Sequence, residues 1–279
     1  MKYMTFNSSC SYAGVANMLS QYGIDTDDRT IALKMHLPYL FAKEDGTYLS
    51  GPMLQSADWF NLYLHPIGFT MTEREIQREQ VTEMLQGEGT AMLGIRVSPQ
   101  SKHAVIYLGE NHGSYRFLNN KWQHTDEPEQ LLLSESELLA RLDDSVVVAT
   151  LKPIPSREVD FQPLLKQSVQ VLEDLKCDVQ AFCAKQQSPQ ALMAAMNTLL
   201  RAILLDGITM LELCGETALA EKLRSVQGEF LTAVRKKSAV TLSKEIAVDA
   251  LVEAIAEYQQ LIEQRRAVTS SPSRAEPLP

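Results

Sequence analysis

The stretch that decides the fold is NSSCSYAGVANMLSQYG, residues 7–23. Its apolar side chains recur at helical spacing, at Val15, Met18, Leu19 and Tyr22. Gly23 is the residue type that commonly ends a helix. The pattern predicts a short helix from Ser11 to Gln21, with Cys10 at its N-terminal end.

Cys10 differs from the other cysteines of the chain in its surroundings. It follows a polar run, residues 7–9, whereas three cysteines lie in apolar helical patterns and are predicted to be packing residues: Cys177, Cys183 and Cys214. A thiol reacts as its thiolate, and the partial positive charge at a helix N-terminus favours an anion. We therefore predict a nucleophile at Cys10. Without CxxC spacing or partnered histidines, we expect no metal and no cofactor.

Beyond the first helix, the period of the apolar residues changes. Helical spacing predicts further helices at about 26–35, 55–63 and 79–86. Short apolar or alternating runs predict strands at 91–97, 103–108, 115–118 and 146–151. Asn111-His112-Gly113 suits a hairpin turn, and Ser134 with Glu137 fits a capping box for a helix to about Leu142. Helices followed by an antiparallel sheet predict an α+β fold.

Two of the predicted strands carry the polar groups that a thiol nucleophile needs. His103 opens one strand, and Asn119 and Asn120 follow on the next. A protonated histidine favours the thiolate, and an asparagine oxygen that accepts the imidazole N–H fixes the ring. Successive strand residues point to opposite faces, so only one asparagine can serve. The acidic residues of the following segment, Asp126, Glu127 and Glu129, are predicted to lie in a solvated loop.

At these residues the sequence resembles papain-like cysteine peptidases. The run from His103 to Ile106 and the segment Asn120-Lys121-Trp122 are similar to their histidine strand and Asn-Ser-Trp segment. The part from Cys10 to Gly23 is similar to bacteriocin-processing, C39-like peptidases and to the N-terminal domain of the butirosin-pathway acyltransferase. The resemblance covers about residues 5–152. It implies a papain-like domain with catalytic Cys10 and His103, and with Trp122 shielding the asparagine–histidine hydrogen bond.

The resemblance leaves the orienting asparagine open. The Asn-x-Trp spacing selects Asn120, which we prefer, whereas the bacteriocin-type spacing of sixteen residues after the histidine selects Asn119. The families also place an oxyanion-hole glutamine six residues before the cysteine, where this chain has Met4. We expect Asn7 and the backbone N–H of Cys10 to serve instead.

The families have glycine directly after the nucleophile, where this chain has Ser11. Together with Met4, this departure makes peptide hydrolysis less expected than the triad itself.

The chain changes character near Pro153-Ile154-Pro155. After it, four helical stretches are predicted, at about 159–186, 188–214, 216–237 and 242–267. Their short connections predict antiparallel neighbours. We therefore expect a papain-like domain at 1–153, an all-α four-helix bundle at 154–268, and a disordered polar tail at 269–279.

The bulk composition excludes several classes of function. The net charge of −9 over 279 residues argues against nucleic-acid binding. No apolar run approaches the roughly 20 residues of a membrane span, and the N-terminus lacks a signal core, so we expect a cytoplasmic protein without membrane contact.

The leading functional hypothesis is an amide-forming acyltransferase that works through a Cys10 thioester. A cysteine peptidase or amidase with the same residues and a catalytically inactive papain-like binding module are the alternatives. Transfer is preferred because Cys10 lies too close to the start for a propeptide, and because no signal, membrane or ATPase segment accompanies it. The expected partners are an acyl donor on a carrier protein or peptide and an amine acceptor. The helical domain is the candidate surface for a homo-oligomer.

Overall fold

A computed structural model describes residues 1–99, 101–236 and 238–270. This part of the chain divides into two compact units. The sheet unit comprises Met1–Met35 and Gln55–Val159, and the helical unit comprises His36–Leu54 and the residues from Asp160 onward. The boundary expected after residue 153 therefore does not separate the two units fully, because the early segment His36–Leu54 belongs to the helical unit.

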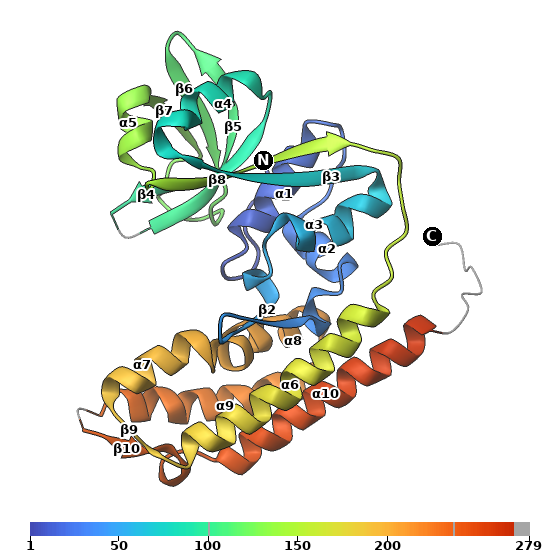
Figure 1. The fold of residues 1–279 in the computed structure, drawn as a ribbon, viewed down its shortest axis with the longest axis vertical. Helices are drawn as coiled ribbons and strands as arrows, with labels where there is room; N and C mark the ends of the chain where they lie inside the picture. The colour runs from blue at the N-terminus through green and yellow to red at the C-terminus, as the bar shows by residue number, and fades with distance from the viewer. Residues whose placement is uncertain (100, 237, 271–279) are drawn as a thin grey trace. The chain divides into compact units, whose positions relative to one another are not determined.

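The sheet unit contains a six-stranded antiparallel sheet, as far as the chain is described, in the order β3-β8-β4-β5-β6-β7 (Figure 1). The strands are β3 (Phe69–Gln77), β4 (Ala91–Ser98), β5 (Ser101–Asn111), β6 (Ser114–Asn119), β7 (Gln130–Ser134) and β8 (Ser145–Pro153). The sequence predicted β4, β5, β6 and β8 but missed the two edge strands. Charged side chains are common on edge strands, and Glu73, Arg74 and Glu75 hide the strand character of β3.

Two local signals of the sheet unit are confirmed. His112 and Gly113 join β5 to β6 with backbone φ angles of 50° and 76°, the left-handed pair that a tight hairpin turn requires. The Ser134 backbone N–H donates to Glu137 Oε2 at 2.8 Å, and the Ser134 hydroxyl accepts from the Glu137 backbone N–H at 3.4 Å. This capping box starts α5 (Glu135–Ala140).

Helices cover both faces of the sheet. The remaining helices of the unit are α1 (Cys10–Ser20), α2 (Asp28–Lys34), α3 (Ala57–Leu64) and α4 (Val81–Gly87). Leu93 and Val105 join a buried cluster with α4 and α5 on one face. Side chains alternate along a strand, so the neighbouring Met92 and Ile106 point to the opposite face, where α1 packs on β4 and β5.

Gly14 lets α1 lie close to the sheet. A Cβ atom at this position would lie 2.6 Å from Met92 Sδ and 2.8 Å from Asn120 Nδ2. Real Cβ atoms do not approach other atoms so closely, so a larger residue requires these side chains to shift or α1 to move outward. The sequence thus sets the separation between the helix that Cys10 begins and the sheet.

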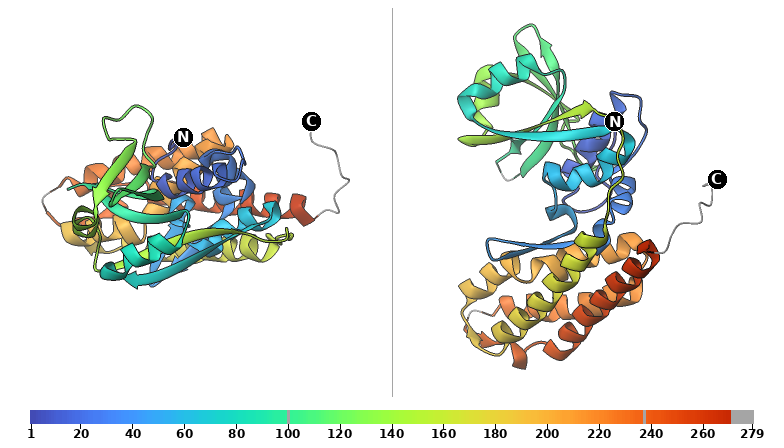
Figure 2. Two further views of the ribbon diagram at one scale, coloured as in Figure 1. Left: turned by 90° about the horizontal axis from the view of Figure 1, so that it is seen from above. Right: turned by 45° about the vertical axis from the view of Figure 1, so that its right-hand side comes forward.

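The helical unit is built from five helices within the described residues, α6 (Gln162–Cys183), α7 (Pro189–Thr198), α8 (Ile208–Cys214), α9 (Thr217–Val234) and α10 (Val248–Ser270). α10 packs on α6 and on α9 (Figure 2). The short strand pair β9 (Gln186–Gln187) and β10 (Val240–Thr241) joins the ends of α6 and α9. The four-helix bundle stays a prediction.

The early segment 36–54 joins the helical unit through a hairpin, β1 (Phe41–Glu44) and β2 (Thr47–Ser50). Strand β1 packs on α6, where the Phe41 backbone N–H donates to Ser168 Oγ at 2.9 Å. The buried Tyr258 hydroxyl of α10 donates to the Pro38 carbonyl at 2.8 Å. These contacts join positions far apart in sequence, which explains why periodicity could not reveal them.

The single helix expected over 188–214 is interrupted. A π-helical segment, Ala202–Gly207, separates α7 from α8, and the two halves are bent by 52°. No single helix among the described residues is long and apolar enough to cross a membrane, and this bent pair passes that test only when its halves are joined. The predicted tail is corrected at residues 269 and 270, which continue α10, and its remainder lies outside the described residues.

Candidate active site

Cys10 is the first residue of α1 and carries a free, partly exposed thiol. The other cysteines lie in the helical unit. Burial raises the pKa of the Cys183 thiol to about 11, and burial also raises the pKa of Cys214. Cys177 is exposed on α6, so the prediction that it is a packing residue is wrong. Cys10 alone among these thiols begins a helix.

The buried carboxylate of Asp28 holds the segment in front of Cys10. It accepts hydrogen bonds from the Thr5 backbone N–H at 2.7 Å, the Thr5 hydroxyl at 2.7 Å and the Ser9 hydroxyl at 2.6 Å. Ser9 occupies the N-cap position of α1, yet its side chain does not cap the helix. Asp28 thereby fixes the chain in front of Cys10 and engages the Ser9 hydroxyl, which does not cap α1.

His103 is held by Asn119. Its Nδ1 atom lies 2.9 Å from Asn119 Oδ1, and its side chain is 16% exposed. Asn119 Nδ2 donates to the Pro128 carbonyl at 3.1 Å, which assigns the oxygen of the amide to the imidazole. An amide oxygen can only accept, so the proton of the neutral ring lies on Nδ1 and Nε2 is left as the basic nitrogen.

Asn120 does not orient His103, so our preference for it over Asn119 is wrong. Its Nδ2 donates to the Ala104 carbonyl at 2.8 Å, and its Oδ1 accepts from Asn17 Nδ2 at 2.9 Å. It is fully buried and ties the start of β5 to α1. Strand alternation separates the two asparagines, but their sequence alone did not show which face each would take.

Glu127 is a site residue that the sequence reading placed in solvent. Its Oε2 atom lies 3.3 Å from His103 Nδ1 and 3.4 Å from Asn119 Nδ2. Its side chain is 29% exposed, so the expectation of a fully solvated loop is wrong for this residue. The missed strand β7 pairs with β6, and the segment between them therefore returns past Asn119. A sequence prediction that included β7 would have indicated that Glu127 comes close to Asn119.

The sequence also singled out three further positions of the site, namely Asn7, Met4 and Trp122. Asn7 lies exposed in the turn before α1, and its role stays a prediction. Met4, in the sequence position of the family's glutamine, is buried, and its backbone N–H donates to the Lys121 carbonyl at 3.0 Å. Trp122 bridges to Met4 through the backbone and is 40% exposed, and its shielding role also stays a prediction.

Gln55 is a second residue that the sequence reading missed. It lies before α3, and its Oε1 accepts from the hydroxyl of Ser11 at 2.9 Å. Ser11 directly follows the predicted nucleophile. This bond engages the oxygen of the amide and leaves the Nε2 hydrogens of Gln55 as donors beside the first turn of α1. Ser11 in place of glycine is the sequence signal that could have drawn attention to a polar partner here.

The two main candidates lie on elements that pack together, since α1 contacts β5. His103 stands near the end of the regular ladder. The β5–β6 pairing ends at Val105–Asn119, and on the other side the β4–β5 register shifts between Arg96 and Ser98. The imidazole is thus mounted at an end of the sheet.

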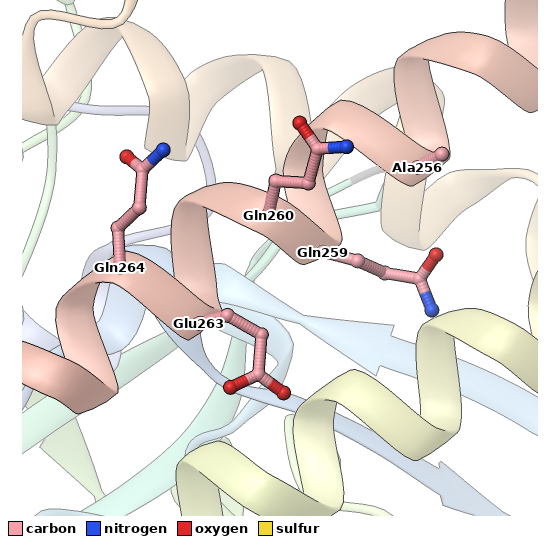
Figure 3. A pocket seen from close by; sticks show the side chains of 5 residues that line it. All are labelled: Ala256, Gln259, Gln260, Glu263 and Gln264. Carbon is pink, nitrogen blue, oxygen red and sulfur yellow. The ribbon is translucent and has the colours of Figure 1, made fainter.

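Other sites in the described chain offer less chemistry. Within residues 1–99, 101–236 and 238–270, no group of three His, Cys, Asp or Glu side chains could hold a metal ion. Figure 3 shows a shallow pocket on α10 lined by Ala256, Gln259, Gln260, Glu263 and Gln264. Its lining holds neither a thiol nor an imidazole, and Gln259 Nε2 already donates to the Val169 carbonyl at 3.1 Å.

Comparisons with known proteins give only distant likenesses. No protein-family model matches the chain, and no curated protein matches it. Among solved structures, it is similar to the peptidase domain of Streptococcus ComA, a bifunctional ABC transporter involved in quorum sensing, at 9% identity and a TM-score of 0.38, over 54% of this chain and 96% of that chain. It is also similar to a protein described as a C39-like peptidase from Bacillus anthracis, at 11% identity and a TM-score of 0.31, over 53% of this chain and 91% of that chain. At these scores the likeness carries no argument about this chain.

Proposed function

We propose that this protein is a papain-type cysteine enzyme that forms a thioester through Cys10. His103 is the general base and acid, and Asn119 orients it. The observation that carries the proposal is the 2.9 Å contact between His103 Nδ1 and Asn119 Oδ1, because it leaves Nε2 free to exchange a proton with a thiol. The placement of Cys10 at the start of α1 supports it, since a helix N-terminus favours the thiolate.

The chemistry follows from these roles. The Cys10 thiol gives its proton to His103 Nε2, and the thiolate sulfur attacks an acyl carbonyl carbon to give a tetrahedral oxyanion. The oxyanion collapses, the bond to the leaving group breaks, and the imidazolium returns its proton to that group. Water or an amine then attacks the thioester, with His103 taking a proton from it, and the Cys10 sulfur leaves as a thiolate that takes this proton back from the imidazolium. The mechanism requires the thiol and Nε2 to come within hydrogen-bond reach at the start of β5.

The oxyanion needs donors near Cys10. The backbone N–H of Cys10 and the side-chain amide of Gln55 are our candidates, because Ser11 holds the oxygen of that amide at 2.9 Å and leaves its hydrogens as donors. The side-chain amide of Asn7 is the alternative to that of Gln55. Both side-chain amides are neutral, so either can stabilise the developing negative charge without a change of protonation.

The acceptor decides between transfer and hydrolysis. Amide-forming transfer remains our preferred reaction, although Cys10, His103 and Asn119 would serve a peptidase or amidase equally. The acyl donor on a carrier or peptide, the amine acceptor and self-association stay predictions.

Acyl-enzyme formation tests the proposal without knowledge of the natural substrate. The protein is mixed with 4-nitrophenyl acetate, quenched in acid and digested, and each cysteine peptide is analysed by mass spectrometry. We expect one acetyl group on Cys10 in the native protein and none in His103→Ala, with Cys177 as the internal exposed-thiol reference. Adding an amine then separates transfer from hydrolysis, as acetamide or acetate product. Equal acetylation of Cys10 and Cys177, unchanged in His103→Ala, would contradict the proposal.

A further inference from the structure

The loop between β6 and β7 brings a carboxylate to the nitrogen of His103 that does not exchange protons with the thiol. Glu127 Oε2 lies 3.3 Å from His103 Nδ1, beside the 2.9 Å contact from Asn119 Oδ1. The same oxygen lies 3.4 Å from Asn119 Nδ2. Each of the three side chains therefore contacts the other two, and the Asn119 amide lies against both the His103 ring and the Glu127 carboxylate.

We infer that Glu127 is a positioning residue of this site. Its carboxylate holds the Asn119 amide and the His103 ring in place, and it stabilises the imidazolium that forms when the ring takes the thiol proton. The inference rests on the proposed function for its role in catalysis. The contact between Glu127 and the imidazole does not depend on that function.

Charge explains why this contact matters. Asn119 is neutral, so it can fix the tautomer of the ring but supplies no compensating charge when Nε2 becomes protonated. A carboxylate within about 4–6 Å of a protonated base favours the charged form. Glu127 is 29% exposed and His103 is 16% exposed, so water weakens the attraction without removing it. The carboxylate thereby offsets part of the positive charge that the ring gains with the proton of Cys10.

Four other charged groups of the surrounding elements are engaged elsewhere. Lys102 Nζ on β5 pairs with Asp143 at 2.6 Å, and Arg96 on β4 pairs with the same carboxylate. Glu129 accepts from the Tyr3 hydroxyl at 2.7 Å. Lys121 Nζ donates to the Thr125 carbonyl at 2.8 Å. Glu127 is thus the carboxylate that the described contacts place at the imidazole.

A matched set of variants separates charge from shape. Glu127→Gln removes the charge and keeps the size, Glu127→Asp keeps the charge, and Asp126→Asn removes a charge from the exposed neighbouring residue. The readout is the exchange of the His103 Nδ1 proton with water, followed by NMR, with its signal assigned by its loss in His103→Gln. We expect this exchange to be several-fold faster in Glu127→Gln, to be largely restored in Glu127→Asp, and to stay unchanged in Asp126→Asn, because a carboxylate is a stronger hydrogen-bond acceptor than an amide.

A second readout links the contact to reactivity. At neutral pH the rate of Cys10 alkylation by iodoacetamide should fall by about 3- to 10-fold in Glu127→Gln and stay unchanged in Asp126→Asn. Unchanged exchange of the His103 Nδ1 proton in Glu127→Gln would overturn the inference. If the exchange becomes faster while Cys10 in the native protein reacts no faster than a free small thiol, the positioning contact stands and the proposed function fails. Thermal unfolding of each variant checks that the fold is retained.

Discussion

His103 Nδ1 lies 2.9 Å from Asn119 Oδ1, although Asn120 directly follows Asn119 in the sequence and binds the Ala104 carbonyl instead. The two neighbouring asparagines therefore have different tasks. One fixes the ring that is proposed to activate the nucleophile, and the other joins α1 to the sheet through Asn17. Alanine substitutions at the two positions should therefore have different effects: a loss of Cys10 reactivity at Asn119 and a loss of stability at Asn120.

Asn119→Ala should lower the reactivity of Cys10. Without the amide oxygen the imidazole loses its strongest neutral acceptor, so its tautomer and orientation are no longer fixed. We expect the alkylation rate of Cys10 by iodoacetamide to fall by about 10-fold or more. Peptide-resolved mass spectrometry measures it.

Asn120→Ala is the control for Asn119→Ala. It should leave the alkylation rate of the folded protein within about two-fold and lower the free energy of unfolding by about 1–3 kcal/mol, because the Ala104 carbonyl and the Asn17 amide lose their partner. Equal losses of reactivity in both variants would contradict the separate roles.

Gly14→Ala should destabilise the sheet unit. The added Cβ would meet Met92 Sδ at 2.6 Å and Asn120 Nδ2 at 2.8 Å, and the latter atom is fixed by its hydrogen bond to Ala104. Overpacking of this kind costs about 1–3 kcal/mol. Urea unfolding measures the change.

Gly228→Ala provides the matched control for Gly14→Ala. Gly228 lies inside α9 with no atom within 4 Å of an added Cβ, so alanine should stabilise by about 0.5–1 kcal/mol. A Gly14→Ala protein as stable as the native one would contradict the predicted overpacking between α1 and the sheet.

Gln55→Ala should slow acylation of Cys10 but not its alkylation. Acylation passes through an oxyanion, whereas displacement of iodide by sulfur does not. Loss of one oxyanion donor costs about 10²–10³ in rate. We therefore expect the rate of Cys10 acetylation by 4-nitrophenyl acetate to fall by about 10² in Gln55→Ala, with iodoacetamide alkylation unchanged.

Asn7→Ala is the matched comparison for the oxyanion donor. If Gln55 is the donor, Asn7→Ala retains native acetylation. A large loss in Asn7→Ala together with native behaviour of Gln55→Ala would assign the donor to Asn7 and contradict our choice.

The helical unit should lose stability as the pH falls below about 6.5. Burial, together with the nearby Arg265 charge, lowers the pKa of His36 to about 4. The folded protein therefore keeps this ring neutral, while the unfolded chain binds a proton at about pH 6.5, so stability is full above that pH and is lost as the pH falls toward 4. Allowing for partial exposure, we expect a loss of about 2 kcal/mol.

His36→Asn tests this pH dependence. His36 has a φ of 57°, a left-handed conformation that asparagine tolerates, so the variant removes the titration without adding strain. The difference between native and His36→Asn stability, measured by urea unfolding at pH 7 and 4.5, should shrink or reverse at the lower pH. The exposed His124→Asn serves as control, and a pH-independent difference for His36→Asn would refute the assignment.

Much of the sheet unit could be predicted because its elements are local. The spacing of Val15, Met18 and Leu19 predicted α1 to within a residue, and the capping box at Ser134 predicted the start of α5. Edge strand β3 escaped because its exposed positions carry charges.

Tertiary contacts decided what the sequence could not. The hairpin of β1 and β2 joins the helical unit through contacts such as Phe41 to Ser168, more than a hundred positions apart. The candidate site also depends on contacts between positions far apart in sequence. Cys10 and His103 could be proposed from residue type and order, whereas Asn119 over Asn120, Glu127 and Gln55 depended on which face or loop comes near.

The most direct test of the account is the rate of Cys10 alkylation by iodoacetamide as a function of pH, in native protein and in His103→Ala, with Cys177 as the exposed reference thiol. The account predicts that Cys10 reacts at neutral pH at least about ten times faster than Cys177, and that His103→Ala abolishes this advantage. Rates for Cys10 that follow those of Cys177 across the pH range in both proteins would contradict it.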